Sequence, residues 1–138
     1  MARTVLIDTG PIVAALRARD QHHNWARAQL ESLTEPCLTC EAVISESFFL
    51  LGAAPQSKER LVQILERGIL RVEFDFPSSR SETLRLVQRY DDTPMSFADA
   101  CIVRMSEMFR DSAVFTTDSD FLNYRRYGRQ VIPLLAPW

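Results

Sequence analysis

The chain has 138 residues, of which 46% are hydrophobic and 25% are charged, and its formal net charge is −2. These values are ordinary for a soluble globular protein, and the length predicts one domain, residues 1–138, with a single substantial core. The longest stretch without a charge, residues 47–57, is far too short to cross a bilayer, so we expect no membrane-spanning segment.

The cysteines and basic residues add two expectations. The first residues run straight into a strand, which predicts no signal peptide, and three cysteines without an export signal indicate reduced thiols in a cytoplasmic protein. Fifteen of the sixteen basic residues are arginine, whose planar guanidinium suits phosphate. A local arginine-rich surface is therefore compatible with RNA or DNA, although genome composition also explains this bias.

Apolar and polar residues alternate in a pattern that predicts strands and helices in turn. We expect, in chain order, a strand over 3–8, helices over 11–18 and 22–33 (the second capped by Asp20), a strand over 36–39, helices over 40–52 and 57–67, a strand over 69–76, helices over 78–90 and 96–110, a strand over 112–116, a short helix over 119–127 and a strand over 130–134. Strand 69–76 alternates apolar and charged residues, which is typical of an edge strand with one covered face. The order predicts an α/β fold with a mainly parallel sheet and helices on both faces.

A carboxylate ends the first predicted strand. Three consecutive β-forming residues, 5–7, precede Asp8, and Gly10 and Pro11 then break the strand before a helix. Residues at the carboxyl ends of central strands lie where open α/β sheets bind their ligands. Alternatively, Asp8 or Thr9 caps the following helix, with Pro11 in its first turn.

Glu46 interrupts an apolar stripe in the predicted helix 40–52. The stripe has helical spacing and consists of Ala42, Val43, Phe49, Leu50 and Ala53. Because an unpaired buried carboxylate is costly, Glu46 should contact a metal ion or, alternatively, one of the many arginines. Glu41 lies in the first turn, where the helix dipole favours a carboxylate, so we interpret it as structural.

Two further carboxylate sites mark helix starts. Residues 96–99 (Ser-Phe-Ala-Asp) fit a capping box, which explains Asp99 structurally, yet Asp99 also opens a largely apolar helix face. Asp118 and Asp120 follow strand 112–116 where the next helix begins, and Asp118 or Ser119 is a candidate N-cap. Adjacent tips of parallel strands would bring Asp8 and Asp118 within reach of one ion.

These carboxylates suggest a chemistry if they converge. Clustered carboxylates raise each other's pKa unless cations compensate. Oxygen ligands without histidine or thiolate select Mg²⁺ or Mn²⁺ rather than zinc. Such ions activate a water molecule and stabilise the leaving oxygen of a phosphodiester. Convergence would therefore indicate metal-dependent phosphodiester cleavage.

The same positions resemble the motifs of a known family. Four segments in order, residues 7–11, 39–51, 90–100 and 115–121, resemble the acidic motifs of the PIN-domain ribonucleases, and most closely those of the small VapC-type toxins of bacterial toxin–antitoxin pairs. Each motif alone is weakly specific, whereas four in this order and at these separations are strongly specific. The resemblance covers nearly the whole chain.

The resemblance implies a three-layer α/β/α sandwich and a Mg²⁺- or Mn²⁺-dependent endoribonuclease acting on RNA. It implies that the metal-binding acids are Asp8, Glu46, Asp99 and Asp118, with Asp120 as a fifth. Thr116 would orient a carboxylate or a water molecule. Members of the family commonly form homodimers and are inhibited by a small antitoxin protein.

Two other functions remain open on the sequence alone. A non-catalytic PIN fold that binds RNA by shape and charge would show the same motifs. Cys37 and Cys40 form a CxxC pattern, which suggests a thioredoxin-like redox protein, although two small buried thiols at a strand end explain it as well.

Overall fold

The computed structural model describes residues 3–52 and 54–138. Five strands form one parallel sheet in the order β3-β2-β1-β4-β7. Their bounds are β1 Thr4–Ile7, β2 Cys37–Thr39, β3 Leu70–Val72, β4 Ser112–Phe115 and β7 Leu134–Leu135. A separate antiparallel hairpin consists of β5 (Arg125–Arg126) and β6 (Gln130–Val131).

Strands β1 and β4 form the buried centre of the sheet. Leu6 pairs with Val114 and Ile7 pairs with Phe115, and all four side chains are fully buried. A strand covered on both faces requires such a continuous apolar run. Because the two strands are parallel and in register, the residues that follow them emerge side by side at the carboxyl edge.

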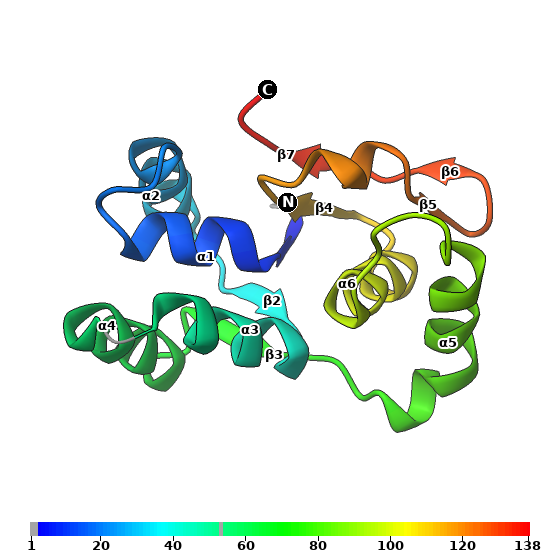
Figure 1. Cartoon of the computed structure of the whole chain (residues 1–138), viewed down its shortest axis with the longest axis horizontal. Helices are drawn as coiled ribbons and strands as arrows, with labels where there is room; N and C mark the ends of the chain where they lie inside the picture. Colours follow the sequence, from blue (N-terminus) through cyan, green and yellow to red (C-terminus); the bar gives the residue numbers. More distant parts are fainter. Residues whose placement is uncertain (1–2, 53) are drawn as a thin grey trace.

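Helices cover both faces of this sheet. They are α1 (Thr9–Leu16), α2 (His23–Ser32), α3 (Glu41–Leu51), α4 (Pro55–Glu66), α5 (Arg80–Arg89) and α6 (Phe97–Met108), with the 3-10 turns η1 (Pro77–Ser79) and η2 (Ser119–Leu122). Figure 1 shows the strands from β7 at the top to β3 at the bottom, with α1 and α2 to their left and α5 and α6 to their right. The expected three-layer α/β/α arrangement with a mainly parallel sheet is confirmed.

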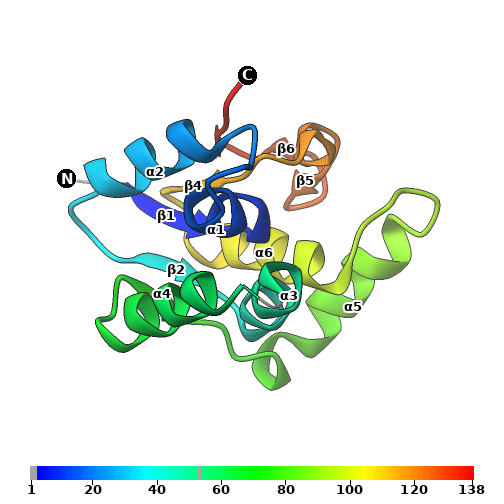
Figure 2. The ribbon, with the colours of Figure 1, turned by 60° about the vertical axis from the view of Figure 1, so that its left-hand side comes forward.

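Helix α3 packs against several other helices. It contacts α1, α4 and α6, and it lies between α4 and α5 in both ribbon views (Figures 1 and 2). Val43, Ser47 and Leu51 form its buried face. Gly52 ends the helix with a φ of 59°, in the left-handed region that glycine adopts without strain.

The structure corrects several predicted elements. The expected helix 119–127 is wrong: the chain forms only η2 there and then enters β5, and the expected strand 130–134 is split between β6 and β7. The expected strand 69–76 shrinks to three residues, although β3 does lie at the sheet edge. Asp20 does not occupy the N-cap of α2, which is His22, but its carboxylate accepts a hydrogen bond from the His22 amide.

No helix in residues 3–52 or 54–138 is long and apolar enough to cross a membrane.

Candidate active site

Asp8 lies at the carboxyl end of β1 and is 5% exposed. It occupies the N-cap position of α1, yet its side chain makes no capping hydrogen bond. Its amide instead donates to the Phe115 carbonyl, which ties it to the end of β4. The backbone of Asp8 is therefore held by the neighbouring strand β4.

Thr116 connects the acidic residues at the ends of β1 and β4. Its buried hydroxyl donates to Oδ2 of Asp8 at 2.9 Å and accepts from the amide of Asp118 at 3.0 Å. Asp118 is the N-cap of η2, as one prediction proposed, and its Oδ1 accepts from the Asp120 amide at 2.9 Å. Gly10 keeps this edge close-packed, because a Cβ at that position would collide with the Thr117 hydroxyl.

Asp99 reaches the same region from α6. The predicted capping box is present: the Ser96 hydroxyl accepts from the Asp99 amide at 3.0 Å, and Oδ2 of Asp99 accepts from the Ser96 amide at 3.1 Å. The same Oδ2 lies 3.2 Å from the hydroxyl of Tyr124, whose single proton is shared between this oxygen and the Pro94 carbonyl, also at 3.2 Å. Oδ1 of Asp99 has no hydrogen-bond donor in the part of the chain that the structure describes. Capping thus occupies one oxygen and leaves the other for a ligand.

Electrostatics show that these carboxylates are close together. Burial is the main cause that raises the pKa of Asp8 from its ordinary value of 3.8 to about 7, and the negative charges of Asp99 and Asp118 contribute to the rise. Burial is also the main cause that raises the pKa of Asp99, with a contribution from Asp118. Within the described residues, no ion pair involves Asp8, Asp99, Asp118 or Asp120. The cluster therefore lacks a protein cation to balance it.

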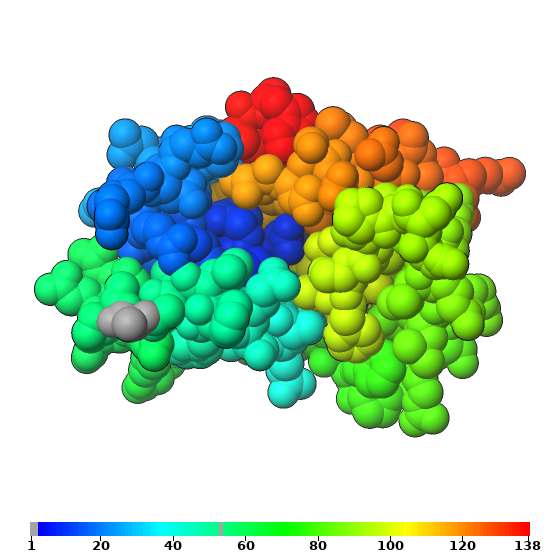
Figure 3. Space-filling model, viewed as in Figure 1, coloured from blue at the N-terminus to red at the C-terminus, as the bar shows by residue number. Residues whose placement is uncertain are grey.

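Glu46 differs from the other predicted acids. The expected buried stripe on α3 is wrong, because Phe49 is 81% exposed and Leu50 is 44% exposed, and Ala53 lies outside the described residues. Glu46 is half-buried, and within residues 3–52 and 54–138 its carboxylate forms no ion pair, so the alternative of an arginine partner is not supported. No hydrogen bond links Glu46 to Asp8, Asp99 or Asp118 in this part of the chain. Figure 3 shows the start of α1 (dark blue) at the centre of the face, bordered by α3 (teal) below it, by α6 (yellow) to its right and by η2 (orange) above it.

The carboxylates fit a hydrated magnesium or manganese ion better than a fully ligated one. No three histidine, cysteine, aspartate or glutamate side chains form a ready-made metal cluster within the described residues. Mg²⁺ usually keeps several waters and takes only one or two carboxylates from the protein. Asp8 and Asp99 supply hard oxygen donors without histidine, and the buried hydroxyl of the adjacent Thr9 has no hydrogen-bond partner in the described part of the chain.

Sequence reasoning missed Tyr124. This fully buried residue donates its hydroxyl to Asp99, and its ring packs edge to face against Phe121 and Tyr90. The segment was expected to be helical, and a tyrosine between polar residues carries no signal of a partner that lies 25 residues away. Only the folded chain reveals that Tyr124 supports Asp99.

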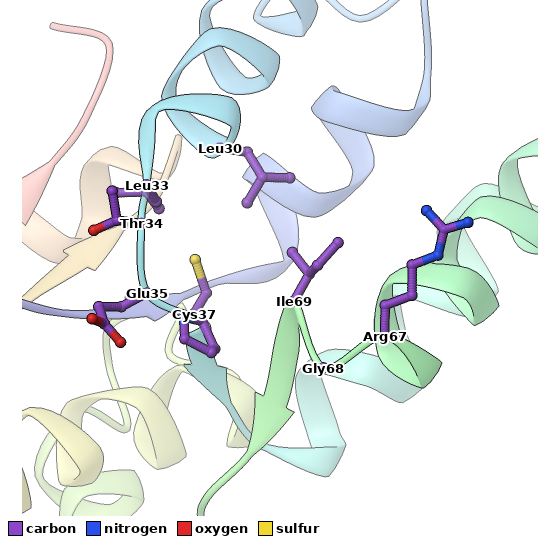
Figure 4. A pocket seen from close by; sticks show the side chains of 9 residues that line it. Leu30, Leu33, Thr34, Glu35, Cys37, Arg67, Gly68 and Ile69 are labelled. Carbon is purple, nitrogen blue, oxygen red and sulfur yellow. The ribbon is translucent and has the colours of Figure 1, made fainter.

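Cys37 and Cys40 do not form a redox pair. Cys37 and Cys40 lie at opposite ends of the extended β2 segment, about 10 Å apart at the usual rise per residue, which exceeds the reach of a disulfide. Cys37 lines a hollow of about 250 Å³ at the amino ends of β2 and β3, where its sulfur lies among Leu30, Leu33 and Ile69 (Figure 4). Burial raises the pKa of Cys37 to about 12, so this thiol stays protonated and unreactive.

Comparisons with known proteins identify the fold family. The model of the PIN domain family matches residues 5–127. Among solved structures, VapC20 of Mycobacterium tuberculosis, described as a toxin that cleaves the sarcin–ricin loop, is similar with a TM-score of 0.76 and 21% sequence identity, over 85% of this chain and 92% of that one. No match was found among curated proteins. Since the family model covers most of the sequence, the chain belongs to the PIN domain family.

Proposed function

We propose that this protein is an endoribonuclease that uses Mg²⁺ or Mn²⁺ to hydrolyse RNA phosphodiester bonds. The observation that carries the proposal is the group of carboxylates around Asp8. Asp8 and Asp99 are buried, raise each other's energy when ionised, and have no protein cation beside them in the described residues. A bound divalent cation would remove this repulsion.

Each residue of the site has a proposed role. Asp8, Asp99 and Asp118 would hold the ion, with Glu46 and Asp120 contacting it through water. Thr116 fixes the orientation of the Asp8 carboxylate and the amide of Asp118 at once, so it sets the spacing between two ligands. When bound, the ion would activate a water molecule and stabilise the leaving oxygen of the phosphodiester.

Cleavage of labelled RNA tests this function. Purified protein would be incubated with RNA in Mg²⁺ or Mn²⁺, with EDTA as the metal-free arm. Asp99→Asn should abolish cleavage while keeping the capping box, because the amide oxygen still accepts from Ser96. Asp91→Asn, an equal charge change at an exposed turn, should leave cleavage intact. If RNA is bound but never cleaved in any metal, the protein is instead a non-catalytic RNA-binding module.

We further propose a biological role as the toxin of a toxin–antitoxin pair, acting as a homodimer and inhibited by a small antitoxin. The similarity of fold to VapC20 supports this role. Expression of the chain alone should arrest bacterial growth, and Asp99→Asn should relieve the arrest. Arrest that is unchanged by Asp99→Asn would contradict a toxic ribonuclease.

A further inference from the structure

Two hollows meet at Tyr127, in the turn of the β5–β6 hairpin. The first, of about 350 Å³, lies between α5 and the hairpin, and the second, of about 460 Å³, lies at the end of α6. Figure 1 shows the hairpin beside α5 and α6. The following lining residues of the two hollows are called here the arginine surface: Arg85, Arg89, Arg110, Arg126, Tyr127 and Gln130.

The arginines of the arginine surface have no acidic partner among the residues that the structure describes. Glu82 and Glu107 also line the first hollow, but both pair with Arg104, at 3.6 and 3.1 Å. None of the four arginines of the surface forms an ion pair within residues 3–52 and 54–138. Because the whole chain carries a net charge of −2, this concentration of free arginines is local. It favours a polyanionic ligand.

Arg126 is a buried part of this surface. It is 6% exposed, and its Nη1 donates to the carbonyls of Ser106 and Arg110 at 3.0 and 3.1 Å, which anchors it at the end of α6. These carbonyls orient the guanidinium but carry only the partial charge of a helix end. The Nε atom has no hydrogen-bond partner among the residues that the structure describes. A buried cation without a counterion is costly, so an anion in the adjoining hollow would stabilise it.

Tyr127 presents a rigid aromatic ring between the two hollows. Its φ of 55° is in the left-handed region, which is strained for a tyrosine. Two hydrogen bonds hold it there: its amide donates to Oε2 of Glu107 at 2.8 Å, and its hydroxyl donates to the Glu107 carbonyl at 2.6 Å. Tyr127 as a whole is 44% exposed, and the Arg126 guanidinium lies 5.5 Å from the centroid of its ring. An exposed, fixed ring among arginines is the arrangement on which proteins stack the bases of single-stranded RNA.

We infer that the arginine surface binds a single-stranded segment of RNA, with the arginines contacting phosphates and Tyr127 stacking on a base. Its link to cleavage rests on the proposed function. Helix α6 joins the two regions, since Asp99 lies near its start and Glu107 eight residues later, about 12 Å along the helix. A few nucleotides span that distance, so one strand contacts both the carboxylates and the arginine surface.

Binding measured without cleavage tests this inference. Full-length protein would be titrated into a fluorescein-labelled 12-nucleotide uridine RNA in EDTA, and affinity followed by fluorescence anisotropy at several salt concentrations. Arg85→Gln/Arg89→Gln should weaken binding about tenfold and reduce the slope of log K against log salt by about 1.4, at about 0.7 for each phosphate that the protein no longer neutralises. Tyr127→Leu should weaken binding about tenfold without changing that slope.

The matched control is Arg60→Gln/Arg67→Gln on α4 and its C-cap, two exposed arginines whose loss changes the net charge equally. This control should bind RNA like the wild type. Equal weakening by both double variants, or wild-type affinity in the Arg85/Arg89 variant, would overturn the proposal. Binding of a polyglutamate peptide in place of RNA would also overturn it and would assign the surface to an acidic protein.

Cleavage assays of the same proteins separate the two proposals. If no metal supports cleavage while the Arg85/Arg89 variant still loses RNA affinity, the proposed function fails and the arginine surface stands. If the protein cleaves RNA and the surface variants cleave it with unchanged KM, the arginine surface fails and the proposed function stands.

Discussion

Replacing Asp8 with asparagine should stabilise the metal-free protein at alkaline pH. Asp8 is buried at the end of β1, and its ionised form is opposed first by burial and then by the charges of Asp99 and Asp118. Asparagine has the same shape and still accepts the hydrogen bond from Thr116, but it carries no charge. The substitution therefore removes a destabilising charge and keeps the local packing.

The size and sign of the effect follow from the pKa. The folded-state pKa of Asp8, about 7, is above the ordinary value of 3.8, so the native state holds this proton more tightly than the unfolded state. The stabilisation that the native state gains by holding this proton is present in full below about pH 4, and it is lost as the pH rises through about 7. The difference between the two pKa values corresponds to about 4 kcal/mol in the free energy of unfolding. We expect Asp8→Asn to raise the free energy of unfolding by about 2–4 kcal/mol at pH 8 and to leave it almost unchanged near pH 4.

Urea denaturation in EDTA, followed by circular dichroism at pH 8 and pH 4.5, measures this difference. Asp91→Asn removes a charge from an exposed turn and serves as the control, with an expected change within about 0.5 kcal/mol at both pH values. A loss of stability in Asp8→Asn at pH 8, or a gain that is equal at the two pH values, would refute the reasoning.

Three further predictions concern the same site. Thr116→Val should lower the free energy of unfolding by about 1–3 kcal/mol, because it leaves the Asp118 amide unpaired, and Thr116→Ser should restore most of it in urea denaturation. Tyr124→Phe keeps the ring and removes the hydroxyl from Asp99, so calorimetry should show Mn²⁺ affinity reduced several-fold; unchanged affinity would exclude a supporting role. Mg²⁺ at 10 mM should raise the Tm of the wild type but not that of Asp99→Asn, and an equal rise in both would place the ion elsewhere.

The central sheet and the helix starts follow from local sequence. Residues 5–7 predict β1 because three consecutive β-forming side chains are typical of a strand covered on both faces. The parallel pairing of β1 with β4 then places Asp8 at the carboxyl end of these strands. The capping box at Ser96 is equally local, since both of its hydrogen bonds span three residues. The strand ends therefore predict that Asp8 and Asp118 are neighbours, whereas the approach of Asp99 to Asp8, whose charge helps to raise the Asp8 pKa, depends on how α6 packs against the sheet.

The remaining features depend on packing between distant segments. The apolar residues of α3 lie on several of its faces. Their spacing alone therefore could not show that Val43 and Leu51 are buried while Phe49 is exposed. At the end of η2, the spacing of Phe121 and Tyr124 suits a helix, but both rings are buried in the core and the chain continues into β5. Tertiary packing overrides local preference at both places.

Paramagnetic broadening by Mn²⁺ tests the central claim most directly. Substoichiometric Mn²⁺ would be added to ¹⁵N-labelled, full-length protein, and amide signals followed by NMR. Binding at the proposed site predicts selective broadening of the amides of Asp8, Asp99 and Asp118, and no broadening around Cys37 at the opposite edge of the sheet. Broadening centred elsewhere, or none at millimolar Mn²⁺, would contradict a metal-dependent active site built on these carboxylates.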